Sequence, residues 1–132
     1  MKKLLFVCVG NSCRSIMAEA WLNALISSDR AIAMSAGTEP AEEVNPLAIR
    51  VMKEAGISIE NKKPRMLTPE MNIEFDYIIT MGCMEGCPVT PREKTIKWNI
   101  YDPKGKPVEK FREVRDTIKR EVEKLIYELR LI

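Results

Sequence analysis

The residues best suited to chemistry are a cysteine and an arginine near the N-terminus. Cys8 ends an apolar run that begins at Leu4, and Arg14 follows after five mostly small or polar residues. A helix N-terminus and a guanidinium group both favour the thiolate form of a nearby cysteine. Such a loop can also turn its amide N–H groups toward a bound anion. We therefore predict Cys8 as a nucleophile beneath an oxyanion-binding loop, with anion ligands at Val9, Gly10, Asn11, Ser12, Cys13 and Arg14.

Two further residues complement this loop. Ser15 directly follows Arg14, and its hydroxyl can donate a hydrogen bond to a Cys8 thiolate. Asp102 comes just after an apolar stretch that is expected to form a strand, and its carboxyl group can protonate a departing oxygen. Asp102-Pro103 is also a common way to open a turn, so a purely structural role is the alternative for this residue.

The chain contains four cysteines and no histidine. A Cys–His pair, a Ser–His–Asp triad and any histidine-liganded metal site within the chain are thereby excluded. Cys13 is expected to face the core. Cys83 and Cys87 are four residues apart, and a disulfide between them requires a loose or partly unwound segment. A zinc site built from all four cysteines is an alternative, but Arg14 beside a zinc ion is difficult to explain.

Composition is typical of a globular protein with one domain over residues 1–132. Apolar residues make up 45% of the chain and charged residues 30%, and the net charge is only +2. So small a charge gives no argument for nucleic acid or for an acidic membrane as a partner. No apolar run approaches the roughly 18–20 residues of a membrane span, and the apolar start is too short for a signal peptide. We expect a cytoplasmic monomer without a metal or other cofactor.

The apolar patterns predict strands that alternate with helices. Strands are expected at 4–7, 31–36, 75–81 and 95–100, where short apolar runs end at Gly, Asn or Asp. Helices are expected after the loop at 16–25, from Asn45-Pro46 to Gly56, in a short turn after Thr68-Pro69, and from Val108 onward.

Alternating strands and helices favour βαβ units and a parallel sheet with both faces covered. In such a sheet every strand presents its C-terminal end at the same edge. The loops that carry Cys8 to Arg14, Cys83 to Cys87, and Asp102 all follow predicted strands, so we expect them to converge there.

With these motifs in place, the chain resembles the low-molecular-weight protein tyrosine phosphatase superfamily, and within it the thioredoxin-coupled arsenate reductases. The resemblance covers nearly the whole chain. It rests on Cys8-Val9-Gly10-Asn11-Ser12-Cys13-Arg14-Ser15 with Met17-Ala18-Glu19, Ser35-Ala36-Gly37, Asn45-Pro46, Thr80-Met81-Gly82-Cys83, Cys87-Pro88, Asp102-Pro103 and Arg115-Asp116.

The resemblance implies a three-layer α/β/α fold of flavodoxin-like type with a four-stranded parallel sheet. It also implies arsenate reduction, with Cys8, Arg14, Ser15 and Asp102 at the reacting centre and a disulfide relay through Cys83 and Cys87. A thioredoxin-like protein would be the reductant. The order of Cys83 and Cys87 in the relay remains open.

The sequence also departs from this superfamily. Some relatives hold a potassium ion near the loop, with ligands from the region of Lys63 to Arg65, but here these positions are basic or proline. Potassium is therefore not expected. Aromatic residues that grip phosphotyrosine usually follow the Asp-Pro pair, whereas Lys104-Gly105-Lys106 follow it here. A phosphomonoester hydrolase that uses Cys8, Arg14 and Asp102 is the second hypothesis, and a non-catalytic regulator that binds an oxyanion or zinc is the third.

Overall fold

The described residues form four strands and four helices, which alternate over the first half of the chain. The computed structural model describes residues 1–82 and 90–131. In chain order the elements are β1 (Lys2–Cys8), α1 (Arg14–Leu25), β2 (Ala31–Gly37), α2 (Pro46–Glu54), α3 (Met71–Glu74), β3 (Tyr77–Met81), β4 (Thr95–Trp98) and α4 (Val108–Glu128).

The strands form one parallel sheet in the order β2-β1-β3-β4. β1 lies in the interior of the sheet, and its residues Leu4 to Val7 are at most 1% exposed. A strand covered on both faces needs apolar side chains in both directions, which explains the continuous apolar run. The predicted α/β fold with a four-stranded parallel sheet is confirmed.

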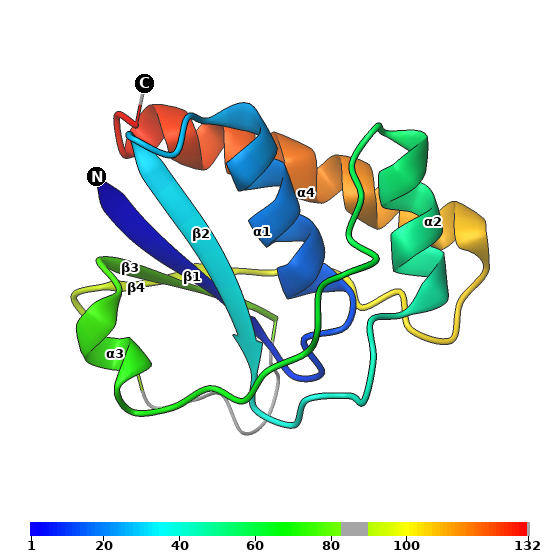
Figure 1. Cartoon of the computed structure of the whole chain (residues 1–132), viewed down its shortest axis with the longest axis horizontal. Coiled ribbons are helices and arrows are strands. Elements are labelled where there is room, and N and C mark those ends of the chain that lie inside the picture. The colour runs from blue at the N-terminus through cyan, green and yellow to red at the C-terminus, as the bar shows by residue number, and fades with distance from the viewer. Residues whose placement is uncertain (83–89, 132) are drawn as a thin grey trace.

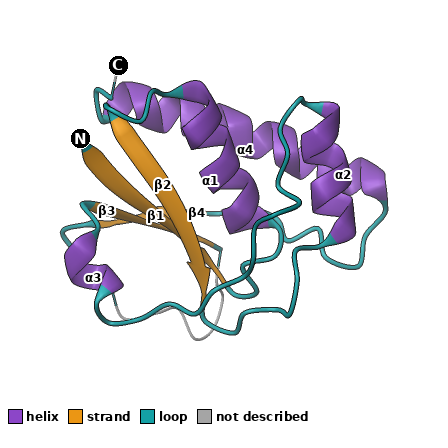
Figure 2. Ribbon diagram, in the orientation of Figure 1, coloured by secondary structure: helices purple, strands orange, loops and turns teal. Residues whose placement is uncertain are grey.

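The three longer helices, α1, α2 and α4, lie on one side of the sheet, as Figures 1 and 2 show. Their apolar side chains form the main core with alternate strand residues such as Leu4, Phe6 and Ile79. The other face carries a smaller cluster around Leu5 and Phe75, and α3 contributes to its cover. Among the described residues, no helix is both long enough and apolar enough to cross a membrane.

The elements follow the expected local signals, with small differences at their ends. Asn45 caps α2, and its side-chain Oδ1 accepts from the amide of Leu47 at 2.9 Å. Phe75 was predicted inside the third strand but lies just before β3, where its buried ring packs on the smaller cluster. Phe75 is apolar because its side chain is buried, and its apolar character does not indicate that it belongs to a strand. β4 ends at Trp98, two residues before the predicted limit.

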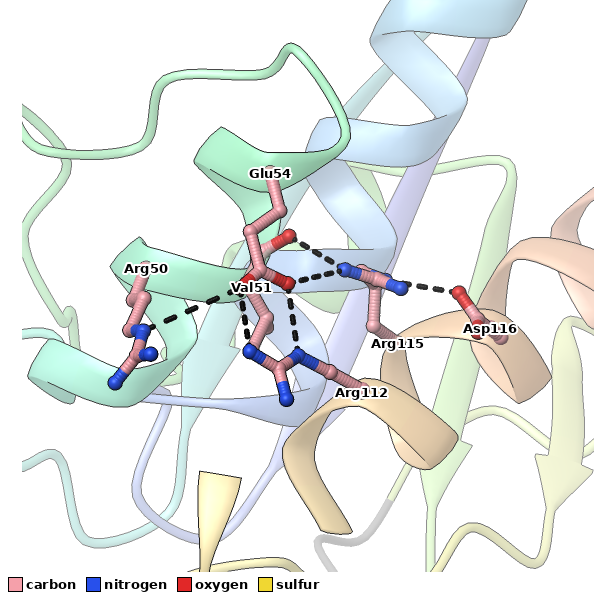
Figure 3. Close-up of polar contacts among 6 residues, drawn as sticks. All are labelled: Arg50, Val51, Glu54, Arg112, Arg115 and Asp116. Carbon is pink, nitrogen blue, oxygen red and sulfur yellow. Dashed lines mark hydrogen bonds and ion pairs between the residues drawn. The ribbon is translucent and has the colours of Figure 1, made fainter. Parts of the chain in front are cut away.

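A group of charged side chains joins α2 to α4 on the outside of the main core (Figure 3). Glu54 on α2 accepts hydrogen bonds from Arg112 and Arg115 on α4, at 2.8–3.0 Å. Arg115 also donates to the backbone oxygen of Val51 at 2.9 Å and pairs with Asp116. These contacts link α2 to α4 at the surface, above the buried residues through which both helices join the main core.

Candidate active site

The loop between β1 and α1 has its carbonyl groups turned away from the site. Amides of the segment 38–45 donate to these carbonyls over 2.9–3.3 Å, and the acceptors are Cys8, Val9, Gly10 and Ser12. Among the hydrogen bonds of the described residues, the amides of residues 9–13 donate to no protein acceptor. The carbonyl groups accept hydrogen bonds on the outer side of the loop. The N–H groups are therefore available to an anion on the inner side of the loop.

The close approach of two loops depends on Gly37 at the end of β2. A Cβ atom at this position would lie 2.5 Å from the carbonyl oxygen of Val9 and 3.0 Å from the backbone nitrogen of Asn11. Backbone atoms cannot yield easily to such a contact. Gly37 is therefore the residue that lets the 38–45 segment run alongside the loop.

Cys8, Ser15 and Asn11 form a buried chain of polar contacts. The Sγ atom of Cys8 lies 2.9 Å from Oγ of Ser15, and Nδ2 of Asn11 donates to the same Oγ at 2.7 Å. Because the Ser15 oxygen accepts a hydrogen bond from Asn11, the Ser15 hydroxyl can donate its own hydrogen bond to the sulfur of Cys8. Asn11 adopts a left-handed backbone conformation with φ of 48°, which asparagine tolerates better than most residues.

Arg14 begins α1 and is only 4% exposed. Its Nη1 donates to the carbonyl oxygen of Met81, and to that of Ile100 at 3.2 Å. These carbonyls lie at the end of β3 and just after β4, so one guanidinium nitrogen joins three elements. Nε makes no hydrogen bond with the described residues, and Nη2 faces Asp102, so both can turn their donors to a ligand in the site.

Asp102 faces Arg14 across the site. Its Oδ2 lies 3.6 Å from Nη2 of Arg14, whereas its Oδ1 accepts from the amide of Lys104 at 3.1 Å. The side chain of Asp102 is 50% exposed. One oxygen thus holds the turn, as the structural interpretation predicts, and the other faces Arg14, where a proton donor would have to lie; the general-acid role of Asp102 stays a prediction.

These residues enclose a cavity of about 170 Å³. Cys8, Arg14 and Asp102 line it, together with the loop residues Val9, Gly10, Ser12 and Cys13 and with Glu39, Ala41 and Lys104. No aromatic side chain is among these described lining residues. The space, the inward amides and the guanidinium suit a compact tetrahedral oxyanion.

Cys13 belongs to the same loop but packs into the main core, where it is 4% exposed. Burial raises the pKa of its thiol to about 11, and only part of this effect is offset by the hydrogen bond with Ser12. A thiol with so high a pKa stays protonated near neutral pH.

Two of the predicted relay residues, Cys83 and Cys87, lie outside the described residues. Gly82, which precedes them, has φ of +76°, and a Cβ there would lie 3.2 Å from Nη1 of Arg14. The described part of the predicted convergence is therefore present: the β1 loop, the end of β3 and the Asp102 loop meet at one edge.

Sequence reasoning missed a buried acidic residue next to the site. Glu19 on α1 is 7% exposed; its Oε1 accepts from Oγ of Ser35 at 2.8 Å, and its Oε2 pairs with the ammonium of Lys62. In the sequence Glu19 stands between the apolar positions of the predicted helix, where a solvent-facing residue is expected, and its partner Lys62 is 43 residues away, so no local signal marks it as buried.

These contacts bear on the potassium ion of some relatives. The carboxylate of Glu19 already has the Lys62 ammonium as its cation, and Lys63 and Arg65 lie beside it. Residues with this charge do not fit a potassium ion.

Within 1–82 and 90–131, no three His, Cys, Asp or Glu side chains are grouped to hold a metal ion. The zinc alternative includes Cys83 and Cys87, which lie in the segment that is not described.

Residues 3–131 match the family described as low molecular weight phosphotyrosine protein phosphatase. The chain belongs to this family, as its parallel sheet and the loop from Cys8 to Arg14 indicate. Within the family, it is similar to an arsenate reductase of Staphylococcus epidermidis, with 39% identity over 125 residues that cover 92% of this chain and 94% of the relative.

Solved structures show the same similarity. A crystal structure of arsenate reductase from Archaeoglobus fulgidus has 37% identity and a TM-score of 0.79, covering 93% of this chain and 98% of that one. A thioredoxin-dependent arsenate reductase from Corynebacterium glutamicum has 32% identity and a TM-score of 0.83, covering 99% of this chain and 63% of that one.

Proposed function

We propose that this protein is an arsenate reductase that uses Cys8 as its nucleophile and a disulfide relay recycled by a thioredoxin-like protein. The observation that carries the proposal is the small cavity above Cys8, which has inward amides and Arg14 but no aromatic lining residue. A cavity of about 170 Å³ accommodates an inorganic oxyanion, whereas an aryl phosphate would project beyond it without an aromatic surface to contact. Arsenate reductases among the relatives support the same choice.

In the first step arsenate binds to the amides of the loop and to Nε and Nη2 of Arg14. The Cys8 thiolate, which accepts from Ser15, attacks the arsenic atom and forms a sulfur–arsenic bond. Asp102, which faces Arg14 at 3.6 Å, protonates the oxygen that leaves. The amides and the guanidinium balance the negative charge during the attack.

In the second step the thiolate of Cys83 attacks the sulfur of Cys8. A Cys8–Cys83 disulfide forms while the sulfur–arsenic bond breaks, and its electron pair reduces arsenic from the +5 to the +3 state. Arsenite then leaves. Cys87 attacks Cys83, which frees Cys8 and leaves a Cys83–Cys87 disulfide for an external dithiol to reduce.

A thioredoxin-like partner fits this cycle because each turnover leaves one disulfide. The similar structure from Corynebacterium glutamicum is that of a thioredoxin-dependent arsenate reductase. The cycle also requires a compartment that keeps thiols reduced, which favours the cytoplasm. No step requires a metal ion or an organic cofactor.

Counting thiols before and after one equivalent of arsenate tests the central step. The reduced protein has four cysteines, and we expect two thiols to be lost with the release of one arsenite. An unchanged thiol count after arsenate exposure would contradict the proposal.

Single variants separate the members of the relay. Cys8→Ser is expected to remove all activity, whereas Cys87→Ser should complete one turnover and then stop, since Cys8 cannot be released. The measurement is arsenite formed per protein in a burst assay with thioredoxin and its reductase. Repeated turnover by Cys87→Ser would refute the relay as written.

Phosphomonoester hydrolysis is the second candidate function, because Cys8, Arg14 and Asp102 also have the arrangement that this reaction needs. Rapid hydrolysis of p-nitrophenyl phosphate that is unaffected by Cys83→Ser would support it. Slow hydrolysis would not decide between the two functions, since the shared loop is expected to cleave aryl phosphates weakly.

A further inference from the structure

The structure contains a second polar cavity that the proposed reaction does not use. It has a volume of about 340 Å³, twice that of the cavity above Cys8, and none of its lining residues is shared with that cavity. Its lining residues are Ile16, Glu19, Ser35, Asn61, Lys62, Lys63 and Arg65.

The charged residues of this second cavity leave an excess of positive charge. Glu19 contributes one negative charge and is already paired with Lys62. Lys63 and Arg65 then remain, and among the described residues neither side chain has a hydrogen bond or an ion pair with the protein. Three positive charges and one negative charge give a net charge of +2, which a single divalent anion would neutralise.

We propose that this second cavity binds a divalent tetrahedral oxyanion, such as phosphate, sulfate or arsenate, as a site separate from the one above Cys8. Lys63 and Arg65 supply the positive charge, and the polar side chain of Asn61 lies beside them. Lys62 does not take part as a free cation because it neutralises the buried Glu19.

The backbone of this segment is bonded directly to the nucleophile loop. The amide of Arg65 donates to Oδ1 of Asn11 at 2.9 Å, and Asn11 in turn donates to Ser15 beside Cys8. The carbonyl of Arg65 accepts from the amide of Gly37 at 2.8 Å. An anion that holds the 61–65 segment in place therefore also holds Asn11, so each site should favour occupancy of the other.

Sulfate is a suitable probe because it has the charge and shape required but does not depend on arsenate reduction. We would titrate the reduced, ¹⁵N-labelled protein with sulfate at low ionic strength and follow its amide resonances. Wild type should show two saturable sets of shifts, one over residues 9–14 and one over residues 61–65. The second set should weaken strongly as salt is added.

The test variant is Lys63→Ala/Arg65→Ala, which retains the amide of residue 65 that bonds to Asn11. We expect its affinity for sulfate at the 61–65 segment to fall by at least about tenfold, and its affinity at residues 9–14 to fall by about twofold or more. Lys53→Ala/Lys124→Ala is the matched control, because it also removes two exposed positive charges but lines neither cavity. It should bind as wild type does.

Two outcomes would overturn the second site. One is a wild-type titration in which only residues 9–14 respond, and the other is a Lys63→Ala/Arg65→Ala variant that retains both sets of shifts. Arsenate reduction by the same variants is measured separately, so a failure of the second site leaves the proposed reaction intact.

Discussion

Cys8 and Cys13 belong to one short loop, line the same cavity and pack against the same core, but their thiols have different partners. The sulfur of Cys8 contacts the Ser15 hydroxyl at 2.9 Å. The sulfur of Cys13 lies 3.8 Å from the Ser12 hydroxyl, and burial raises the pKa of this thiol to about 11. The two thiols should therefore differ greatly in reactivity, although both are almost inaccessible to solvent by area.

We expect iodoacetamide at pH 8 to modify Cys8 far faster than Cys13. With a pKa of about 11, only about 0.1% of Cys13 is thiolate at that pH, and the thiolate is the reactive form. Mass spectrometry of digested samples taken over time gives both rates, and sulfate should protect Cys8 alone. Equal rates in the folded protein would show that the loop does not distinguish the two thiols.

At the scale of elements, the end of β3 is shaped around Arg14. Gly82 has φ of +76°, and a Cβ at this position would lie 3.1 Å from the carbonyl oxygen of Ile100 and 3.2 Å from Nη1 of Arg14. The residue thus combines a left-handed backbone with a close approach to the guanidinium. Gly56 has a similar φ of +83°, but a Cβ there would meet nothing within 4 Å.

This contrast gives a matched pair of variants. Gly56→Ala and Gly82→Ala should both lose about 1–2 kcal/mol of stability, because alanine disfavours a left-handed backbone. Only Gly82→Ala should also displace Arg14, and we expect its affinity for phosphate to fall by about tenfold or more. Urea unfolding and phosphate titration measure the two effects. Equal phosphate affinity in both variants would argue against the role of Gly82.

The contact between α2 and α4 should depend on pH. Hydrogen bonds from Arg112 lower the pKa of Glu54 from 4.5 to about 2. A carboxyl group with a lowered pKa stabilises the fold fully above about pH 4.5, and this contribution is lost as the pH falls toward 2. The side chains of the ion pairs drawn in Figure 3 are partly exposed, so their contribution should be small.

We therefore expect Glu54→Gln to lower the melting temperature by no more than roughly 3 °C at neutral pH. The difference from wild type should shrink between pH 4.5 and pH 2. Calorimetry over this range measures it, with Glu123→Gln on the exposed side of α4 as the control. A difference that stays constant down to pH 2 would mean that ionisation of Glu54 is not its cause.

At the scale of the whole molecule, an anion above Cys8 would connect segments from much of the chain. Arg14 joins the start of α1 to the end of β3 and to the segment after β4, and the 38–45 segment holds the loop from outside. Binding to the folded state alone should therefore raise the stability of the entire fold.

Phosphate at about 100 times its dissociation constant should add about 2.7 kcal/mol of stability, which corresponds to a rise in melting temperature of roughly 5–10 °C. In a Lys63→Ala/Arg65→Ala background, which removes the proposed second site, the shift should be mostly lost when Arg14→Ala is added. Scanning calorimetry with increasing phosphate measures it, and chloride at equal ionic strength is the control. The same shift in this background with and without Arg14→Ala would place the bound phosphate elsewhere.

The amino-acid sequence by itself determined the elements and the chemical character of the site. The apolar runs of the strands, the Asn45 cap of α2 and the spacing of Cys8, Arg14 and Ser15 are signals contained within a few neighbouring residues. Parallel pairing then brings Asp102 to the same sheet edge, because consecutive strands in such folds share their direction. These features could be predicted because each depends on local structure and general topology.

Only the tertiary structure decided which distant groups hold the site together. Arg14 donates to carbonyls 67 and 86 residues away, and Asn11 accepts from an amide 54 residues away. Lys62 similarly reaches Glu19 from a segment between α2 and α3 that belongs to no helix or strand. These contacts depend on strand order and on the paths of loops with no regular pattern, so no short stretch of sequence encodes them.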